Sequence, residues 1–205
     1  MTDLFKRIFS SIILLPLVLY LIIKGSIYLN ILTITCFIIS SYEWSKMIKK
    51  IIYRLLGMLF LFFSFYTFYQ LAINNSILLP LFICISTDIG GYAFGKILKG
   101  PKLTKISPNK TYAGMIGSYF FSTLFVVLFF YYYNYQVTII WLVTTILISS
   151  ASQIGDIIIS YFKRLSKIKN TGNIIPGHGG LLDRIDGMIF AIPLFYLIEL
   201  TGKLI

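Results

Sequence analysis

Residues 152–186 read SQIGDIIISYFKRLSKIKNTGNIIPGHGGLLDRID and interrupt an otherwise apolar chain. The stretch holds three of the seven acidic residues, five of the eighteen lysines and arginines, and His178, which is the only histidine. Long apolar runs lie on both sides of it. Because charged side chains are costly inside a bilayer, this pattern predicts a membrane scaffold that holds a polar site at the membrane surface.

The composition of the whole chain also indicates a membrane protein. Of its 205 residues, 58% are hydrophobic and only 12% are charged, about half the charged fraction of a typical soluble domain. We therefore expect an all-α integral membrane protein, a polytopic helical bundle that forms one domain over residues 1–205. The net charge of +11 does not indicate a nucleic-acid partner, because most cations lie between apolar runs, where topology and anionic head groups explain them.

The apolar runs predict the number of membrane spans. Crossing about 30 Å of hydrocarbon takes roughly 17–25 residues. The first two runs are separated only by Lys24 and Gly25, which predicts a tight helical hairpin. Residues 1–84 should supply N-terminal helical spans, and residues 85–205 the catalytic helices and cytoplasmic loops. The seven predicted spans are 8–24, 26–43, 55–74, 76–95, 113–133, 137–160 and 187–202.

The distribution of cations predicts the orientation of these spans. With seven spans, sixteen of the eighteen lysines and arginines fall on one side of the membrane. Because positive loops stay in the cytoplasm, the N-terminus should be cytoplasmic and the C-terminus outside. The two long polar loops, 96–112 and 161–186, should then face the cytoplasm.

Asp88 lies inside the fourth predicted span, in the sequence STDIGGYAFGK. A carboxylate within a span costs about 2.5–3.5 kcal/mol on insertion scales, so it usually faces a bundle interior, water or a metal. The neighbouring Gly90, Gly91 and Gly95 would let another backbone approach closely, or let the helix break. The alternative is a helix-packing site in which Asp88 is neutral or paired with a lysine.

The loop KISPNKTYAG, residues 105–114, is a candidate anion site. Ser107 precedes Pro108 and is therefore kept out of the helical conformation, while Pro108 can start the next helix. Ser107 would then lie near an N-cap, with free amides and Lys110 beside it, as an anion requires. An ordinary capped helix start with positive-inside lysines explains these residues equally well.

A third polar group shares one face of the sixth predicted span: Gln153, Asp156, Ser160, Lys163 and Arg164. The spacing from Asp156 is four residues to Ser160 and seven to Lys163. A carboxylate and a hydroxyl one turn apart can bind one hard cation, and the cations below them can meet phosphate. The alternative is that Asp156 pairs with Lys163 or Arg164 at the membrane border.

The last polar group combines a glycine-rich turn with a helix start: Pro176, Gly177, His178, Gly179, Gly180, Asp183, Arg184 and Asp186. The glycines let the backbone wrap closely around a ligand. Asp183 and Asp186 are three residues apart, so they repel each other unless a cation lies between them. With Asp156 they predict a two-metal centre, or one metal with a monovalent cation, for phosphoryl or nucleotidyl transfer. The alternative is helix capping, or pairing with Arg184.

From the residues alone we expect a membrane enzyme with a cytoplasm-facing site that binds metal and phosphate. A nucleotidyltransferase, a lipid kinase and a phosphatase all fit that description. A transporter or channel with Asp88 and Asp156 on an ion path is disfavoured, because the charges gather at one face rather than along a pore.

The same stretch resembles the signature of the phosphatidate cytidylyltransferase (CDP-diacylglycerol synthase) family. Further similarity lies in Ser152–Asp156, around Asp88, and in the Ser107–Gly114 loop, so that the resemblance covers roughly residues 85–200. The chain departs from the family pattern at Asn109, Tyr112, Ala113 and Asn170, where Lys, Trp, Glu and Asp are usual. The matching residues in the signature are Ser160, Lys163, Arg164, Lys169, Gly172, Pro176, His178, Gly179, Gly180, Asp183, Arg184 and Asp186.

The resemblance implies that CTP and phosphatidic acid give CDP-diacylglycerol and pyrophosphate, in phospholipid synthesis at a bacterial inner membrane. It implies Mg²⁺, with or without a second cation (K⁺ or Mg²⁺), held by Asp156, Asp183 and Asp186, with Ser160 completing the shell. The residues expected to grip the triphosphate are Lys163, Arg164, Lys169 and Arg184. The His178-Gly179-Gly180 turn should cradle phosphate or nucleotide, and the lipid phosphate should meet Asp88, Ser107 and Lys110.

The expected partners are CTP, phosphatidic acid and membrane lipids. A homodimer would help to bury a wet site that seven spans do not fully enclose. Two other functions stay open: a catalytically weakened homologue, motivated by Ala113 and Asn170, and another membrane CTP-dependent lipid enzyme similar to a polyprenol or phytol kinase.

Overall fold

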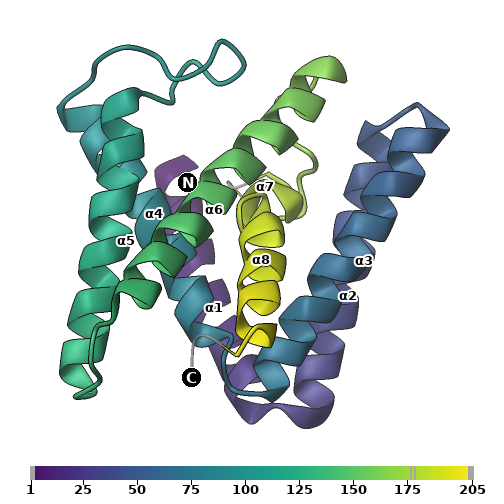
Figure 1. Ribbon diagram of the computed structural model, residues 1–205. Helices are drawn as coiled ribbons and strands as arrows, with labels where there is room; N and C mark the ends of the chain where they lie inside the picture. The colour runs from purple at the N-terminus through teal and green to yellow at the C-terminus, as the bar shows by residue number, and fades with distance from the viewer. Residues whose placement is uncertain (1–2, 176, 178, 203–205) are drawn as a thin grey trace. The chain divides into compact units, whose positions relative to one another are not determined.

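The computed structural model describes residues 3–175, 177 and 179–202, so Pro176 and His178 lie outside the described residues. Apart from two isolated β-bridges, the regular structure of these residues is helical (Figure 1). This confirms the predicted all-α class. The helices are α1 Asp3–Lys24, α2 Ser26–Met47, α3 Ile51–Ile73, α4 Leu78–Ile97, α5 Tyr112–Tyr132, α6 Ile139–Leu165, α7 Leu182–Ile185 and α8 Met188–Leu200.

Five of these helices, α2 to α6, are long and apolar enough to cross a membrane. Helix α8 has 13 residues and extends about 20 Å, which is shorter than the hydrocarbon layer. Large apolar side chains point outward along the long helices, among them Ile31, Leu59 and Leu128, each more than half exposed. Such a surface suits lipid rather than water. The count of seven spans and the cytoplasmic N-terminus stay predictions.

Helix α6 continues beyond the span predicted at 137–160. It ends at Leu165, so that Lys163 and Arg164 form part of its last turn. Cations are favourable there, because the C-terminal end of a helix carries partial negative charge. An apolar run ends where the side chains become polar, whereas a helix ends where its backbone hydrogen bonds end. Here the helix extends five residues beyond the apolar run.

The chain forms two compact units that alternate along the sequence. The first comprises residues 1–75 and 162–186, and the second comprises residues 76–161 and 187–205. Helix α6 contributes residues to both units. The prediction of a single domain stays a prediction.

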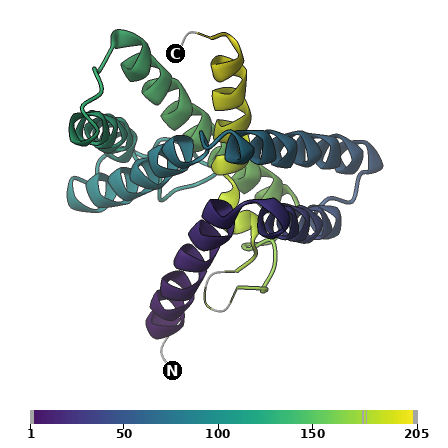
Figure 2. The ribbon, with the colours of Figure 1, turned by 90° about the horizontal axis from the view of Figure 1, so that it is seen from below.

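In the first unit, α2 packs against α1, α3 and α7. Helices α2 and α3 run side by side in both ribbon views (Figures 1 and 2). Only Gly25, with φ of 62°, separates α1 from α2, and the two helices are in contact, as the predicted hairpin requires. The buried Trp44 joins α2 to its neighbours: its Nε1 donates to the backbone oxygen of Arg54 at 3.2 Å, and its ring meets Phe162 edge-on.

In the second unit, α4 and α5 approach closely through glycines. A Cβ atom added to Gly114 would lie 2.8 Å from the carbonyl oxygen of Gly91, and one added to Gly90 would collide with the carbonyl group of Gly117. Helix α4 is continuous through Gly90 and Gly91. Two roles were predicted for these glycines. The structure confirms that they let a neighbouring helix approach closely, and it shows that they do not break α4.

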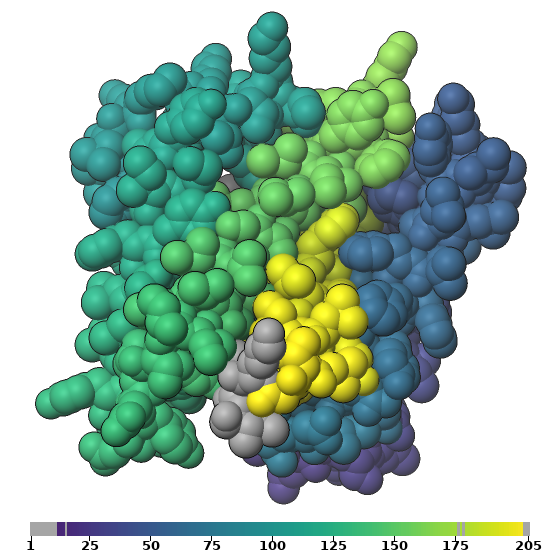
Figure 3. Space-filling view, viewed as in Figure 1, coloured from purple at the N-terminus to yellow at the C-terminus, as the bar shows by residue number. Residues whose placement is uncertain are grey.

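Buried hydroxyls and a glycine connect the remaining helices of this unit. Ser118 donates to the backbone oxygen of Thr87 at 2.8 Å, and Thr87 in turn donates to Ser149 of α6 at 3.0 Å. Gly187, just before α8, packs directly on Ser152 of α6. Figure 3 shows side chains of α8 (yellow) against those of α6 (green).

Candidate functional site

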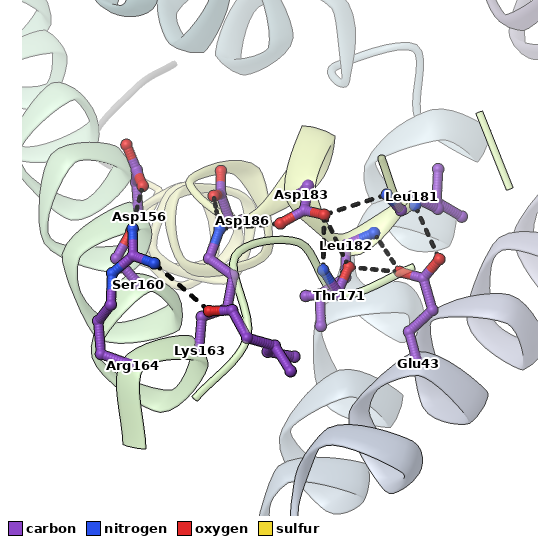
Figure 4. Close-up of polar contacts among 12 residues, drawn as sticks. Glu43, Asp156, Ser160, Lys163, Arg164, Thr171, Leu181, Leu182, Asp183 and Asp186 are labelled. Atoms are coloured by element: carbon purple, nitrogen blue, oxygen red, sulfur yellow. Dashed lines mark hydrogen bonds and ion pairs between the residues drawn. The ribbon is translucent and has the colours of Figure 1, made fainter. Parts of the chain in front are cut away.

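Several of the predicted site residues gather in two clusters, one in each unit, together with residues that the sequence did not single out. The Asp183 cluster, in the first unit, consists of Glu43, Lys163, Thr171, Asp183 and Asp186. The Asp156 cluster, in the second unit, consists of Lys110, Gln153, Asp156 and Ser160. Helix α6 supplies members of both, because it carries Asp156, Ser160 and Lys163 on one face. Figure 4 shows most of these side chains and their contacts.

Lys163 provides the cation of the Asp183 cluster. Its Nζ lies 2.8 Å from Oδ1 of Asp183 and 3.9 Å from Oδ2 of Asp186. The side chains of Lys163 and Asp183 are only 10% and 6% exposed. The sequence predicted that the two aspartates need a cation between them, and the lysine at the end of α6 supplies it. Removing one partner of such a buried pair is strongly destabilising, because the remaining charge has lost its hydration and has no opposite charge to replace it.

The second oxygen of Asp183 closes the glycine-rich loop. Oδ2 accepts the backbone N–H of Thr171 at 2.7 Å and that of Gly180 at 3.0 Å. Gly179 adopts φ of 87°, and a Cβ atom there would lie 3.0 Å from the same oxygen. Both the positive φ and the close approach favour glycine at this position. In this structure the loop therefore wraps around Asp183.

Sequence reasoning missed Glu43. This carboxylate of α2 is 1% exposed and accepts three hydrogen bonds from the loop and from the start of α7 (Figure 4). The N-terminal spans resembled the family only in being apolar, so they were given no part in the site. One signal was available: the rule that marks Asp88 as functional, a carboxylate in an apolar run, applies equally to Glu43.

Lys110 is the partner of Asp156. Nζ of Lys110 lies 2.6 Å from Oδ2 of Asp156 and 3.3 Å from the backbone oxygen of Gln153, while Ser160 donates to Oδ1 of Asp156 at 3.2 Å. The side chains of Lys110 and Asp156 are 22% and 35% exposed, so ligands can reach this pair. In this structure Asp156 pairs with Lys110, whereas Lys163, one of the two cations expected beside Asp156, pairs with Asp183. Instead, the loop before α5 reaches across to α6.

The predicted N-cap at Ser107 is wrong. Helix α5 begins at Tyr112, and its cap is Thr111, whose hydroxyl accepts the N–H of Gly114 at 3.0 Å. Ser107 lies within the preceding loop, where its N–H donates to Thr104 and its carbonyl accepts from the N–H of Lys110. Proline permits a helix start but does not force one, and the threonine hydroxyl four positions later provides the better cap. A role of Ser107 in substrate binding stays a prediction.

The remaining predicted residues lie at the surface of the described chain. Asp88 is exposed on α4. The three further cations of the signature, Arg164, Lys169 and Arg184, are also exposed. This position lets them reach an anion from solution, in contrast to the buried Lys163. His178 lies outside the described residues.

The metal prediction stays a prediction. Among the residues that the structure describes, no three histidine, cysteine or acidic side chains converge into a metal-binding group. The donors themselves are suitable, because carboxylate and hydroxyl oxygens are what Mg²⁺ prefers. An ammonium group lies beside Asp183 and another beside Asp156, so both positions already attract a cation.

Comparison with known proteins decides the family. Residues 50–201, most of the chain, match the Cytidylyltransferase family. The chain belongs to this cytidylyltransferase family. The resemblance seen in the sequence is thereby confirmed, and the matched region extends further toward the N-terminus than the 85–200 predicted. Glu43 lies just outside the region that matches the cytidylyltransferase pattern.

Bacterial cytidylyltransferases with similar sequences align over nearly the whole chain. A phosphatidate cytidylyltransferase of Rickettsia bellii (strain RML369-C) is 36% identical over 213 residues, covering 97% of this chain and 91% of the relative. A phosphatidate cytidylyltransferase of Staphylococcus aureus (strain COL) is 33% identical over 183 residues, covering 87% of this chain and 70% of the relative.

Proposed function

We propose that this chain transfers the cytidylyl group of CTP to phosphatidic acid, giving CDP-diacylglycerol and pyrophosphate. The observation that carries the proposal is the 36% identity, across 97% of the chain, to a protein named phosphatidate cytidylyltransferase. The two charged clusters support it, because they contain signature residues (Ser160, Lys163, Asp183 and Asp186) and present both carboxylates and cations.

The reaction needs positioning and charge neutralisation more than base catalysis. A phosphate oxygen of phosphatidic acid, already anionic at neutral pH, attacks the α-phosphorus of CTP. The bond between the α-phosphorus and the oxygen bridging to the β-phosphate breaks, and pyrophosphate leaves with its electron pair. Two anions must meet, so the protein must align them and offset their repulsion.

The cations divide into buried and exposed groups that suit different tasks. Lys163 is held at a fixed position by two carboxylates, so its charge is oriented before substrate arrives. Arg164, Lys169 and Arg184 are exposed and can close on the triphosphate and the leaving pyrophosphate. On the side of the lipid phosphate we place Asp88, Ser107 and Lys110. The turn at His178-Gly179-Gly180 would contact phosphate or nucleotide.

We further propose Mg²⁺ as the cofactor, with or without a second cation. Its ligands would be Asp156, Asp183 and Asp186, with the Ser160 hydroxyl beside Asp156. Once bound, the metal would neutralise phosphate charge. Because Oδ2 of Asp183 already accepts backbone N–H groups, Oδ1, which now contacts Lys163, is the oxygen that suits a metal.

The proposed setting is a bacterial inner membrane, with the active site facing the cytoplasm and its CTP. Lipid acyl chains would enter laterally between helices, with the head group at the interface. A homodimer is part of this proposal, since it would help to bury a wet site that the spans of one chain do not fully enclose.

The direct test is pyrophosphate release by the purified protein in detergent. The mixture contains CTP, phosphatidic acid and Mg²⁺, and control reactions each lack one of them. Release that requires all three, together with CDP-diacylglycerol in the lipid extract, is the expected result. CDP as the nucleotide product would instead show a kinase, and no product from well-folded protein would show a weakened homologue.

A further inference from the structure

Glu43 is a buried carboxylate of helix α2 that has no part in the proposed chemistry. Its two oxygens accept three hydrogen bonds: Oε1 from the N–H of Leu181 at 3.0 Å, and Oε2 from the N–H of Leu182 at 2.9 Å and the hydroxyl of Thr171 at 2.8 Å. A buried carboxylate is costly unless it is hydrogen-bonded, and here both oxygens are. The loop at Thr171 and the start of α7 therefore supply the donors that let this carboxylate be buried.

The first consequence is that Glu43 caps α7. Leu181 is the N-cap residue of α7, and its own side chain provides no cap hydrogen bond. The first N–H groups of a helix have no partner within the helix, so an acceptor from outside fixes where the helix begins. Asp183 is the second residue of α7. An acceptor on α2 thus determines the position of the backbone that carries Asp183.

The second consequence comes through Thr171, which is 5% exposed. Its hydroxyl lies 2.8 Å from Oε2 of Glu43 and 3.1 Å from Oδ2 of Asp183. A hydroxyl has one hydrogen and donates it to one of the two carboxylates at a time. When the Thr171 hydroxyl donates to Glu43, Oδ2 of Asp183 still accepts the backbone N–H groups of Thr171 and Gly180. Oδ1 of Asp183 still accepts from Lys163.

An independent observation comes from the glycines. A Cβ atom added to Gly172 would lie 2.6 Å from Oε1 of Glu43, and one added to Gly180 would come equally close to that oxygen. Real Cβ contacts are not this short, so a side chain at either position would displace the carboxylate or the loop. Gly172 and Gly180, both in the signature, therefore leave the space that the carboxylate of Glu43 occupies. This role is separate from any contact that they make with a ligand.

We infer that Glu43 is a positioning residue for the transfer reaction: it fixes Thr171 and the start of α7, and thereby holds Asp183 against Lys163. It touches no reacting atom and acts only through Asp183. The inference rests on the proposed function for its catalytic consequence. Its structural part, the order of the loop at 171–182, stands separately and can be measured without turnover.

The test compares Glu43→Gln with wild type and with Glu199→Gln, which changes the other glutamate of the chain. In Glu43→Gln an amide NH₂ faces N–H donors, so the loop should loosen. We expect faster amide hydrogen exchange in peptides covering 171–186, with unchanged exchange in α4 and α5. We also expect kcat to fall by at least about tenfold while KM for phosphatidic acid stays within about threefold, since small misplacements cost rate. Glu199→Gln should match wild type in both readouts.

A second variant covers the case in which Glu43→Gln does not fold. Thr171→Val keeps the shape and removes the hydroxyl that links the two carboxylates, and it should give a smaller change in the same two readouts. Unchanged exchange at 171–186, or equal loosening throughout the protein, would overturn the inference. If wild type itself releases no pyrophosphate, the proposed function fails, while the exchange measurement still decides whether Glu43 orders the loop.

Discussion

Lys110 and Asp156 form an ion pair, with Nζ and Oδ2 2.6 Å apart, that joins the loop before α5 to helix α6. The pair is partly exposed, so it contributes little to stability, about 0–1 kcal/mol. Its value lies in placing an ammonium and a carboxylate together where a substrate can reach them.

Lys110→Met should therefore impair activity more than stability. We expect pyrophosphate release to fall by at least about tenfold, as when one preorganised charge is removed from a reacting site, with little change in Tm. Lys102→Met, at an exposed lysine of the same loop, is the matched control and should keep wild-type activity. Equal losses in the two variants would show that only the general charge of the loop matters.

Lys163→Met should instead unfold the protein more easily. It leaves Asp183 and Asp186 close together without their cation, and breaking a buried ion pair typically costs about 3–5 kcal/mol. Thermal or denaturant unfolding in detergent measures the effect. Lys167→Met removes an exposed charge of the same segment and should unfold as wild type does. If both variants unfold alike, the buried pair does not stabilise the fold.

Gly90→Ala tests the contact between α4 and α5. Its Cβ atom would meet the carbonyl group of Gly117 and lie 2.7 Å from Cβ of Phe121, so overpacking should destabilise the protein by about 1–3 kcal/mol. Gly95→Ala, five residues further along α4, would come no closer than 3.3 Å, to Oγ1 of Thr111, and should therefore cost less. A larger fall in Tm for Gly90→Ala than for Gly95→Ala is the expected result, and equal Tm values would show that the helices separate without cost.

Removal of metal should abolish turnover. We expect a chelator to stop pyrophosphate release and added Mg²⁺ to restore it. Asp186→Asn should need more Mg²⁺ than wild type for half-maximal rate, because it removes one of the proposed ligands without touching the backbone contacts of Asp183. An unchanged Mg²⁺ requirement would remove Asp186 from the ligand set.

The sequence predicted the features that depend on local pattern. Apolar runs predicted helices, and the glycines around Asp88 predicted a close approach that the structure confirms between α4 and α5. Two aspartates three residues apart predicted an intervening cation. The family resemblance was also correct, because a signature is itself a local pattern.

What the sequence did not show depends on partners far apart in the chain. Glu43 lies 128 residues from Thr171 and 139 from Leu182, so no local pattern connects them. Lys110 and Gln153 are 43 residues apart, and only the fold shows that the loop reaches α6. The error at Ser107 differs in kind: two hydroxyl-bearing residues four positions apart could each have capped the helix, and Ser107 instead makes hydrogen bonds within the loop while Thr111 caps α5.

The distance along the chain between Glu43 and its partners also has a consequence for biosynthesis. At about 5–20 residues per second, the ribosome needs roughly 6–25 seconds to add the 128 residues that separate Glu43 from Thr171. During that interval α2 enters the bilayer with a carboxylate whose hydrogen-bond donors have not yet been made. We therefore expect chains truncated before residue 171, which lack every donor to Glu43, to be degraded faster than the full-length chain.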